Sequence, residues 1–183
     1  MKRRIFVKKV AASSTAFSIV PSFVLGKGHV PPSDTLYVSA FGVGGRGAGV
    51  MNGLDNTNKV KYVTLCDVDD RRAAESYIKY PEAKRYKDFR KVFDNHLNEI
   101  DAIIVATPDL THATIALPFM REKKHAYVEK PLTHNIEEAR LMTQVARENG
   151  IVTQMGNQGA SSDGSRAAKE WVKGSYRKGW ELS

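Results

Sequence analysis

A glycine-rich turn is the first segment of the chain with residue types that could bind a ligand. Gly42, Gly44 and Gly47 follow the pattern G-x-G-x-x-G, with Gly45 and Arg46 between the last two glycines. Glycines at this spacing permit a tight turn, let the backbone approach a diphosphate, and let a helix pack closely on a strand. The N-terminus of such a helix also attracts phosphate. The pattern favours a dinucleotide-binding turn, and a plain strand-to-helix turn is the alternative.

A carboxylate follows at the distance that a dinucleotide site requires. Asp67 ends the next apolar run, roughly 20 residues after the glycines, where it can bind both hydroxyls of a ribose. This favours NAD, because a carboxylate repels the 2′-phosphate of NADP. Arg71 and Arg72 lie close enough in sequence to bind that phosphate, so NADP stays an alternative. Asp67 could also cap the helix that follows it.

Two later segments follow apolar runs in the same way. The first runs from Thr107 to His112, and the second is Glu129-Lys130-Pro131. Ligands of parallel sheets bind at the carboxyl ends of the strands, so both segments are predicted to border the cofactor. Lys130 could donate a hydrogen bond to a substrate hydroxyl and stabilise negative charge during hydride transfer. The alternatives are a surface lysine before a proline and a structural or solvated histidine.

The elements that must position these residues alternate between strands and helices. Apolar runs predict strands at 36–41, 60–66, 83–86, 100–106, 125–129 and 151–155. Helices are predicted from the glycine turn onward, for about two turns, then at 70–80, 89–97, 111–121 and 136–148, and from about 165 to 172. The run at 100–106 is apolar on both faces, as a central parallel strand requires. The alternation predicts an α/β fold with a doubly wound parallel sheet of the Rossmann type.

Most of the formal charge of +8 lies at the N-terminus, which limits what it implies. Six basic residues and no acid precede Asp34, so the rest of the chain carries only +2, and we expect no nucleic-acid binding. The segment 2–9 holds a twin arginine, and the apolar stretch at 10–25 is too short and polar for a membrane span. These features predict a twin-arginine signal peptide and a periplasmic protein, with a retained basic arm as the alternative.

The single cysteine, Cys66, lies inside an apolar run. One cysteine excludes a disulfide within the chain and a zinc site made of cysteines. We therefore interpret Cys66 as a small buried hydrophobic residue and predict no metal site.

Taken together, the four segments resemble the Gfo/Idh/MocA family, which includes glucose–fructose oxidoreductase and inositol dehydrogenase. The resemblance covers about residues 35–172 and rests on the glycine turn, Cys66-Asp67, the segment from Ala106 to His112, and Glu129-Lys130-Pro131-Leu132. Met155-Gly156-Asn157-Gln158 is similar to the family segment that approaches nicotinamide and substrate. The resemblance implies a Rossmann domain for NAD(P), a second α/β domain that covers a sugar or inositol, and Lys130 as the active-site lysine.

Two departures from that family affect the expected function. The family places D-x-x-x-H in its second domain, whereas no histidine follows His134, and the chain ends at Ser183 where that domain would begin. We expect a signal peptide and linker at 1–33, a Rossmann domain at 34–173, and a truncated tail at 174–183, lacking the C-terminal α/β domain. A fragment, a truncated gene product and a frameshift all stay open.

These observations predict an NAD(P)-dependent oxidoreductase that acts on a sugar, an inositol or a derivative, present as its nucleotide-binding half. An NAD-dependent glycoside hydrolase of the same fold and a non-catalytic nucleotide-binding module are the alternatives. The expected partners are a dinucleotide and a small carbohydrate, and a full-length protein is expected to form a homo-oligomer. The predicted cofactor-binding residues are Gly42, Gly44, Gly45, Arg46, Gly47, Asp67, Thr107, Pro108, His112, Glu129, Lys130 and Gln158, with Lys130 also catalytic.

Overall fold

The computed structural model describes residues 34–177. The chain divides at Thr35 into an N-terminal segment and a compact unit that begins at Leu36. The predicted signal peptide at 1–33 lies outside the described residues, as does the end of the predicted tail, 178–183. No helix within residues 34–177 is long and apolar enough to cross a membrane.

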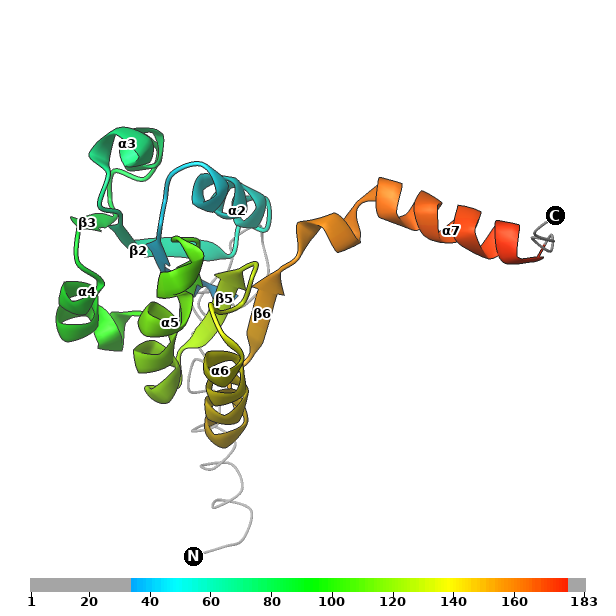
Figure 1. Cartoon of the computed structure of the whole chain (residues 1–183). Coiled ribbons are helices and arrows are strands. Elements are labelled where there is room, and N and C mark those ends of the chain that lie inside the picture. The colour runs from blue at the N-terminus through cyan, green and yellow to red at the C-terminus, as the bar shows by residue number, and fades with distance from the viewer. Residues whose placement is uncertain (1–33, 178–183) are drawn as a thin grey trace, which may run out of the picture. The chain divides into compact units, whose positions relative to one another are not determined.

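Six parallel strands form one sheet in the order β3-β2-β1-β4-β5-β6 (Figure 1). The strands are β1 (Leu36–Phe41), β2 (Val60–Cys66), β3 (Lys84–Tyr86), β4 (Ala102–Val105), β5 (His125–Glu129) and β6 (Thr153–Gly156). The order reverses between β1 and β4, which is the point where a doubly wound sheet opens a crevice for ligands. The predicted α/β doubly wound parallel sheet is therefore confirmed.

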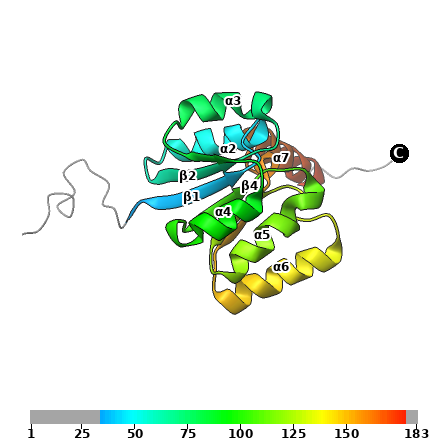
Figure 2. The same ribbon diagram turned by 90° about the vertical axis from the view of Figure 1, so that its left-hand side faces the viewer.

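Helices cover both faces of the sheet. The helices are α2 (Arg46–Asp55), α3 (Asp70–Lys79), α4 (Phe89–His96), α5 (His112–Arg121), α6 (Ile136–Asn149) and α7 (Asp163–Arg177), with short 3₁₀ turns η2 (Leu97–Glu99), η3 (Asp109–Thr111) and η4 (Gln158–Ser161). The first five pack on the sheet, whereas α7 extends away from it beyond β6 (Figure 1). Figure 2 shows α2 and α3 on one face and α4, α5 and α6 on the other. This is the layering that right-handed βαβ crossovers produce.

Each face of the sheet has its own hydrophobic core. On the α2 and α3 face, residues such as Met51 and Leu65 are fully buried. On the opposite face, Phe119 of α5 packs its ring 5.2 Å from the ring of Phe41 on β1. All four residues of β4 are buried, as predicted from a run that is apolar on both sides.

Side-chain caps set where several helices begin. Asp69 caps α3 by accepting hydrogen bonds from the amides of Arg71 and Arg72, and Asp88 caps α4 through the amide of Arg90. Asp69 therefore takes the capping role that the sequence left open for Asp67. The carboxylate of Asp67 does not cap α3, and it lies directly after the carboxyl end of β2.

The structure moves several predicted boundaries, among them both ends of the strand predicted at 100–106, which is observed at Ala102–Val105, and the ends of the last strand and the last helix. The strand predicted at 151–155 begins only at Thr153, because Gly150 ends α6 in a left-handed conformation and the amide of Ile151 donates to Ala146 O at 3.2 Å. The helix predicted at about 165–172 runs from Asp163 to Arg177 and contacts η4. It therefore continues through the boundary placed at residue 173.

Candidate functional site

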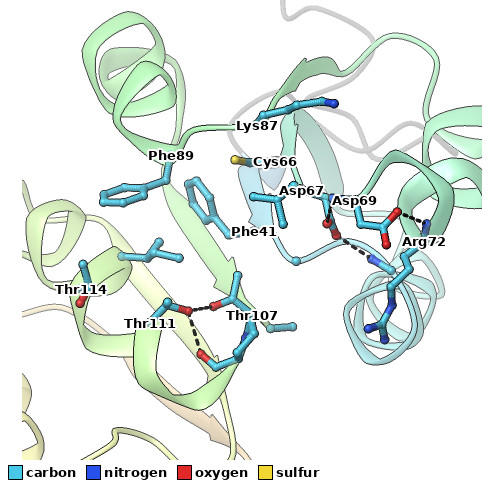
Figure 3. Close-up of a pocket in the computed structure, with 16 residues that line it drawn as sticks. Phe41, Cys66, Asp67, Asp69, Arg72, Lys87, Phe89, Thr107, Thr111 and Thr114 are labelled. Atoms are coloured by element: carbon cyan, nitrogen blue, oxygen red, sulfur yellow. Dashed lines mark hydrogen bonds between the residues drawn. The ribbon is translucent and has the colours of Figure 1, made fainter.

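A cavity of about 730 Å³ opens at the carboxyl ends of β1, β2 and β4, at the point where the strand order reverses. Figure 3 shows Asp67, Asp69 and Arg72 grouped on one side, with Phe41, Phe89 and Thr114 on the other. The lining residues are Phe41, Gly42, Gly44, Cys66, Asp67, Val68, Asp69, Arg72, Lys87, Phe89, Ala106, Thr107, Pro108, Thr111, Thr114 and Ile115. Five of these were predicted from the sequence: Gly42, Gly44, Asp67, Thr107 and Pro108.

The glycine turn has the close approaches that require glycine. Gly42 has a φ of +75°, and a Cβ built on it would lie 2.6 Å from the carbonyl oxygen of Ala106, after β4. A Cβ on Gly47 would overlap the carbonyl oxygen of Gly42. Any larger residue at either position would force the turn away from the strand or from the helix that follows.

The first turn of α2 is suited to bind an anion. Gly45 occupies its N-cap position, no side chain hydrogen-bonds to the cap amides, and the first turn holds no acidic residue. The amides at the start of a helix therefore keep their partial positive charge for a ligand. This is the geometry expected where a diphosphate rests on the turn.

Asp67 is held beside that turn by backbone amides. Its Oδ2 accepts hydrogen bonds from the amides of Val43 at 2.9 Å and Gly44 at 3.3 Å, and its Oδ1 accepts one from the amide of Asp69 at 2.9 Å. Each carboxylate oxygen has two lone pairs, so Oδ1 can still accept a hydroxyl, whereas both lone pairs of Oδ2 already have a backbone donor. The side chain thus stands in the cavity with its orientation fixed.

Of the two arginines that could counter this carboxylate, only Arg72 lines the cavity. Nη2 of Arg72 lies 3.5 Å from the position that a Cβ on Gly45 would occupy, so the guanidinium borders the glycine turn. The side chain of Arg71 is 93% exposed and pairs with Asp69. The backbone amide of Arg71, followed by that of Arg72, lowers the pKa of Asp69, which therefore stays ionised in the cavity wall.

The far wall of the cavity is apolar. Phe41, Phe89 and Ile115 line it together with Cys66, which is 6% exposed. Burial, followed by the charges of Asp67 and Asp88, raises the pKa of the Cys66 thiol to about 12. Cys66 is therefore a neutral hydrophobic residue at pH 7, as interpreted from the sequence, and it also touches the site.

His112 does not line the cavity, although the sequence placed it near the cofactor. Its ring is fully buried, with Nδ1 2.8 Å from the carbonyl oxygen of Pro131 and Nε2 2.8 Å from that of Thr107. Thr107 itself accepts a hydrogen bond from the hydroxyl of Thr111 at 2.8 Å. The ring thus connects the loops that follow β4 and β5.

Three other predicted residues meet at a second position, near the ends of β5 and β6. Oε1 of the buried Glu129 accepts hydrogen bonds from Arg46 Nε at 3.1 Å, from Tyr127 Oη at 3.3 Å, and from the side-chain nitrogen Nε2 of Gln158. The Glu129 hydrogen bond raises the pKa of Arg46. The group ties the glycine turn to the segment that carries Lys130.

Tyr127 was not predicted, although its position gives a signal. It lies two residues before Glu129 on one strand, so both side chains share a face. The other oxygen of Glu129, Oε2, is buried and has no hydrogen-bond partner in the described part of the chain. Lys130 follows as an exposed residue, and its peptide bond to Pro131 is cis.

Within residues 34–177, no group of three or more His, Cys, Asp or Glu side chains could hold a metal ion. The fold and the cavity define a dinucleotide-binding domain of the Rossmann type, because the glycine turn, the uncapped helix and the acid after β2 all border one crevice. The chain belongs to the Gfo/Idh/MocA oxidoreductase family, whose NAD-binding Rossmann-fold model matches residues 37–157.

Known proteins resemble the chain over this domain. A glycosyl hydrolase family 109 protein from Shewanella pealeana is 32% identical over 139 residues, covering 72% of this chain and 28% of the relative. Inositol 2-dehydrogenase from Salmonella typhimurium is 27% identical over 118 residues, covering 63% and 34%. The crystal structure of myo-inositol 2-dehydrogenase from Lactobacillus plantarum superposes with a TM-score of 0.66 at 24% identity, over 76% of this chain and 41% of that one. The chain thus spans about a third of the length of these curated relatives.

Proposed function

We propose that this chain is the nucleotide-binding half of an NAD(P)-dependent oxidoreductase that acts on a sugar, an inositol or a derivative. The observation that carries the proposal is the arrangement around the cavity of about 730 Å³, where the glycine turn and the fixed carboxylate of Asp67 meet at the switch point. Membership of the Gfo/Idh/MocA family and the inositol dehydrogenase relatives support the reaction class.

The residues of the site fit a dinucleotide. The amides at the start of α2 would hold the diphosphate, Asp67 would accept a ribose hydroxyl through Oδ1, and the apolar wall with Phe89 and Ile115 would contact the adenine. When bound, NAD supplies a hydride acceptor. Lys130, after β5, would donate a hydrogen bond to the substrate oxygen and stabilise negative charge on it.

NAD is proposed as the preferred cofactor, with NADP as the alternative. Asp67 lines the cavity with Oδ1 free to accept one more hydrogen bond, and the 2′-phosphate of NADP beside it would meet the charges of Asp67 and Asp69. Arg72 borders the same wall and could offset part of the repulsion. A difference of about 1–2 kcal/mol, or roughly tenfold in Kd, is the expected outcome.

Titration calorimetry with NAD, NADH, NADP and NADPH tests the cofactor. We expect saturable binding of NAD at one site per chain, with a dissociation constant about tenfold lower than that of NADP. Hydride transfer is then tested by following NADH absorbance with inositols and sugars as substrates. A chain that folds but binds none of the four dinucleotides contradicts the proposal.

A glycoside hydrolase that uses NAD is the second candidate. It is favoured by the Shewanella pealeana relative, which is described as a glycosyl hydrolase family 109 protein and shares 32% identity over 139 residues. The two candidates share the cofactor site and differ in products. Release of a chromogenic leaving group from a glycoside without net NADH favours the hydrolase, whereas NADH accumulation favours the dehydrogenase. A non-catalytic nucleotide-binding module would bind NAD and give neither product.

Export and assembly are further parts of the proposal. The twin arginine at Arg3 and Arg4 supports export by the twin-arginine pathway to the periplasm. Replacing both residues with lysine should retain the protein in the cytoplasmic fraction, and unchanged export would contradict this route. We also propose that the full-length protein is a homo-oligomer, which light scattering on that protein would test.

A further inference from the structure

The ring of His112 holds together two loops of the candidate site. His112 begins α5, and its ring is fully buried. Nε2 lies 2.8 Å from the carbonyl oxygen of Thr107, which follows β4, and Nδ1 lies 2.8 Å from that of Pro131, which follows β5. We refer to these two contacts as the His112 bridge. It spans neighbouring strands at the edge of the sheet where the cavity opens.

Both partners of the ring are acceptors, and this restricts the number of protons it carries. A neutral imidazole has one N–H donor and one acceptor nitrogen, whereas an imidazolium has two donors. A neutral His112 would set a nitrogen lone pair against a carbonyl oxygen at 2.8 Å in the protein interior. Unsatisfied polar contacts are costly there, so only the doubly protonated ring completes both hydrogen bonds.

No carboxylate in the described part of the chain forms a hydrogen bond or an ion pair with this ring. The ionisable groups next to the two loops include Asp109 before α5, Lys130 and His134 after β5, and Glu138 in α6. Glu129, at the end of β5, is buried and pairs with Arg46 through Oε1. Glu138 instead accepts a hydrogen bond from the amide of His134 at 3.1 Å. The two carbonyl dipoles are therefore the groups in direct contact with the ring, and they oppose the unfavourable N-terminal end of the helix dipole.

We propose that His112 is a positioning residue that, as an imidazolium, fastens the loop after β4 to the loop after β5. The inference rests on the proposed function, because the first loop gives Thr107 and Pro108 to the cavity and the second carries Lys130. Loss of the Thr107 contact frees one cavity wall. Loss of the Pro131 contact frees the segment next to Lys130.

The proton count of the ring is tested by NMR on the full chain, labelled with ¹⁵N at histidine. The His112 signals are identified as those that disappear in His112→Gln. We expect both ring nitrogens of His112 to carry a hydrogen at neutral pH and to exchange slowly with water. A His112 ring in which one nitrogen carries no hydrogen at neutral pH overturns the proposal.

Two substitutions separate the two contacts. The amide nitrogen of asparagine lies near the place of Nδ1, and that of glutamine lies near the place of Nε2. His112→Asn should therefore keep the Pro131 contact and lose the Thr107 contact, weakening NAD binding about tenfold and speeding hydrogen exchange after β4. His112→Gln should do the reverse, speeding exchange at 130–132 with a smaller loss of NAD affinity.

The outcomes also separate this inference from the proposed function. Equal effects of the two substitutions on both loops would mean that the ring only fills space, and would overturn the bridge. If the unchanged chain fails to bind NAD, the proposed function fails, while the proton count and the exchange pattern still decide for or against the bridge. If neither variant folds, the measurement on the unchanged chain decides alone.

Discussion

Replacement of Asp67 by asparagine should weaken NAD binding by a predictable amount. Two amides converge on Oδ2 and one on Oδ1. Whichever way the asparagine amide turns, its NH₂ group faces at least one backbone N–H. A hydrogen bond to a charged group contributes about 1.5–3 kcal/mol, so the loss of one ribose contact should raise the Kd for NAD about tenfold to a hundredfold.

The same change should affect NADP differently, because it removes the negative charge that would repel a 2′-phosphate. The affinity for NADP should fall less than that for NAD, or rise. The assay is titration calorimetry of both cofactors, with thermal melts to confirm folding. Asp109→Asn is the matched control, since Asp109 is an exposed carboxylate that precedes α5 and does not line the cavity. A Kd for NAD within twofold of the unchanged chain in Asp67→Asn would refute the reasoning.

Three further changes have expected outcomes. Gly42→Ala should destabilise the chain by more than about 1 kcal/mol and abolish NAD binding. Gly53→Ala, which places a Cβ in open space within α2, should instead stabilise the chain by up to about 1 kcal/mol. Urea melts measure both changes in the free energy of unfolding. Burial raises the pKa of the Cys66 thiol to about 12, so the thiolate forms only as the pH approaches that value. Alkylation of Cys66 at pH 8 should therefore be about a thousandfold slower in the folded chain than in the urea-unfolded chain. Equal rates would contradict the burial of this thiol. Glu129→Gln should lower the free energy of unfolding by about 1–3 kcal/mol, and by less when Arg46→Met is also present. A double-mutant cycle of urea melts measures this difference, and additive effects would mean that the pair is not coupled.

Much of the fold follows from local pattern. The strand at 60–66 was predicted to the residue because an apolar run ends in a polar one at Asp67, and β4 was predicted as central because it is apolar on both faces. The apolar pattern does not give the end of an element where a backbone cap competes with the sheet. Ile151 has a strand-forming side chain, yet its amide closes α6.

Some residues of the candidate site could be predicted from local sequence spacing, whereas others come together only through contacts between distant parts of the chain. The positions of Gly42 and Asp67 follow from the spacing of one βαβ unit, and the structure has both at one cavity. The pairing of Arg46 with Glu129 joins residues 83 apart in sequence, and depends on β5 lying two strands from β1. Spacing along a chain does not encode such a contact, because it arises only when the order of strands is fixed.

The spacing between the glycines and Asp67 serves folding as well as binding. In the chain alone, the carboxylate of Asp67 already accepts the amides of Val43 and Gly44, so the acid helps to shape the turn that would receive a phosphate. A ribose would meet a carboxylate whose rotamer is fixed, and little entropy would be lost in ordering it. It follows that substitutions at Asp67 act on both stability and affinity. Only a comparison of NAD with NADP in the same folded variant separates the charge of Asp67 from its role in holding the turn.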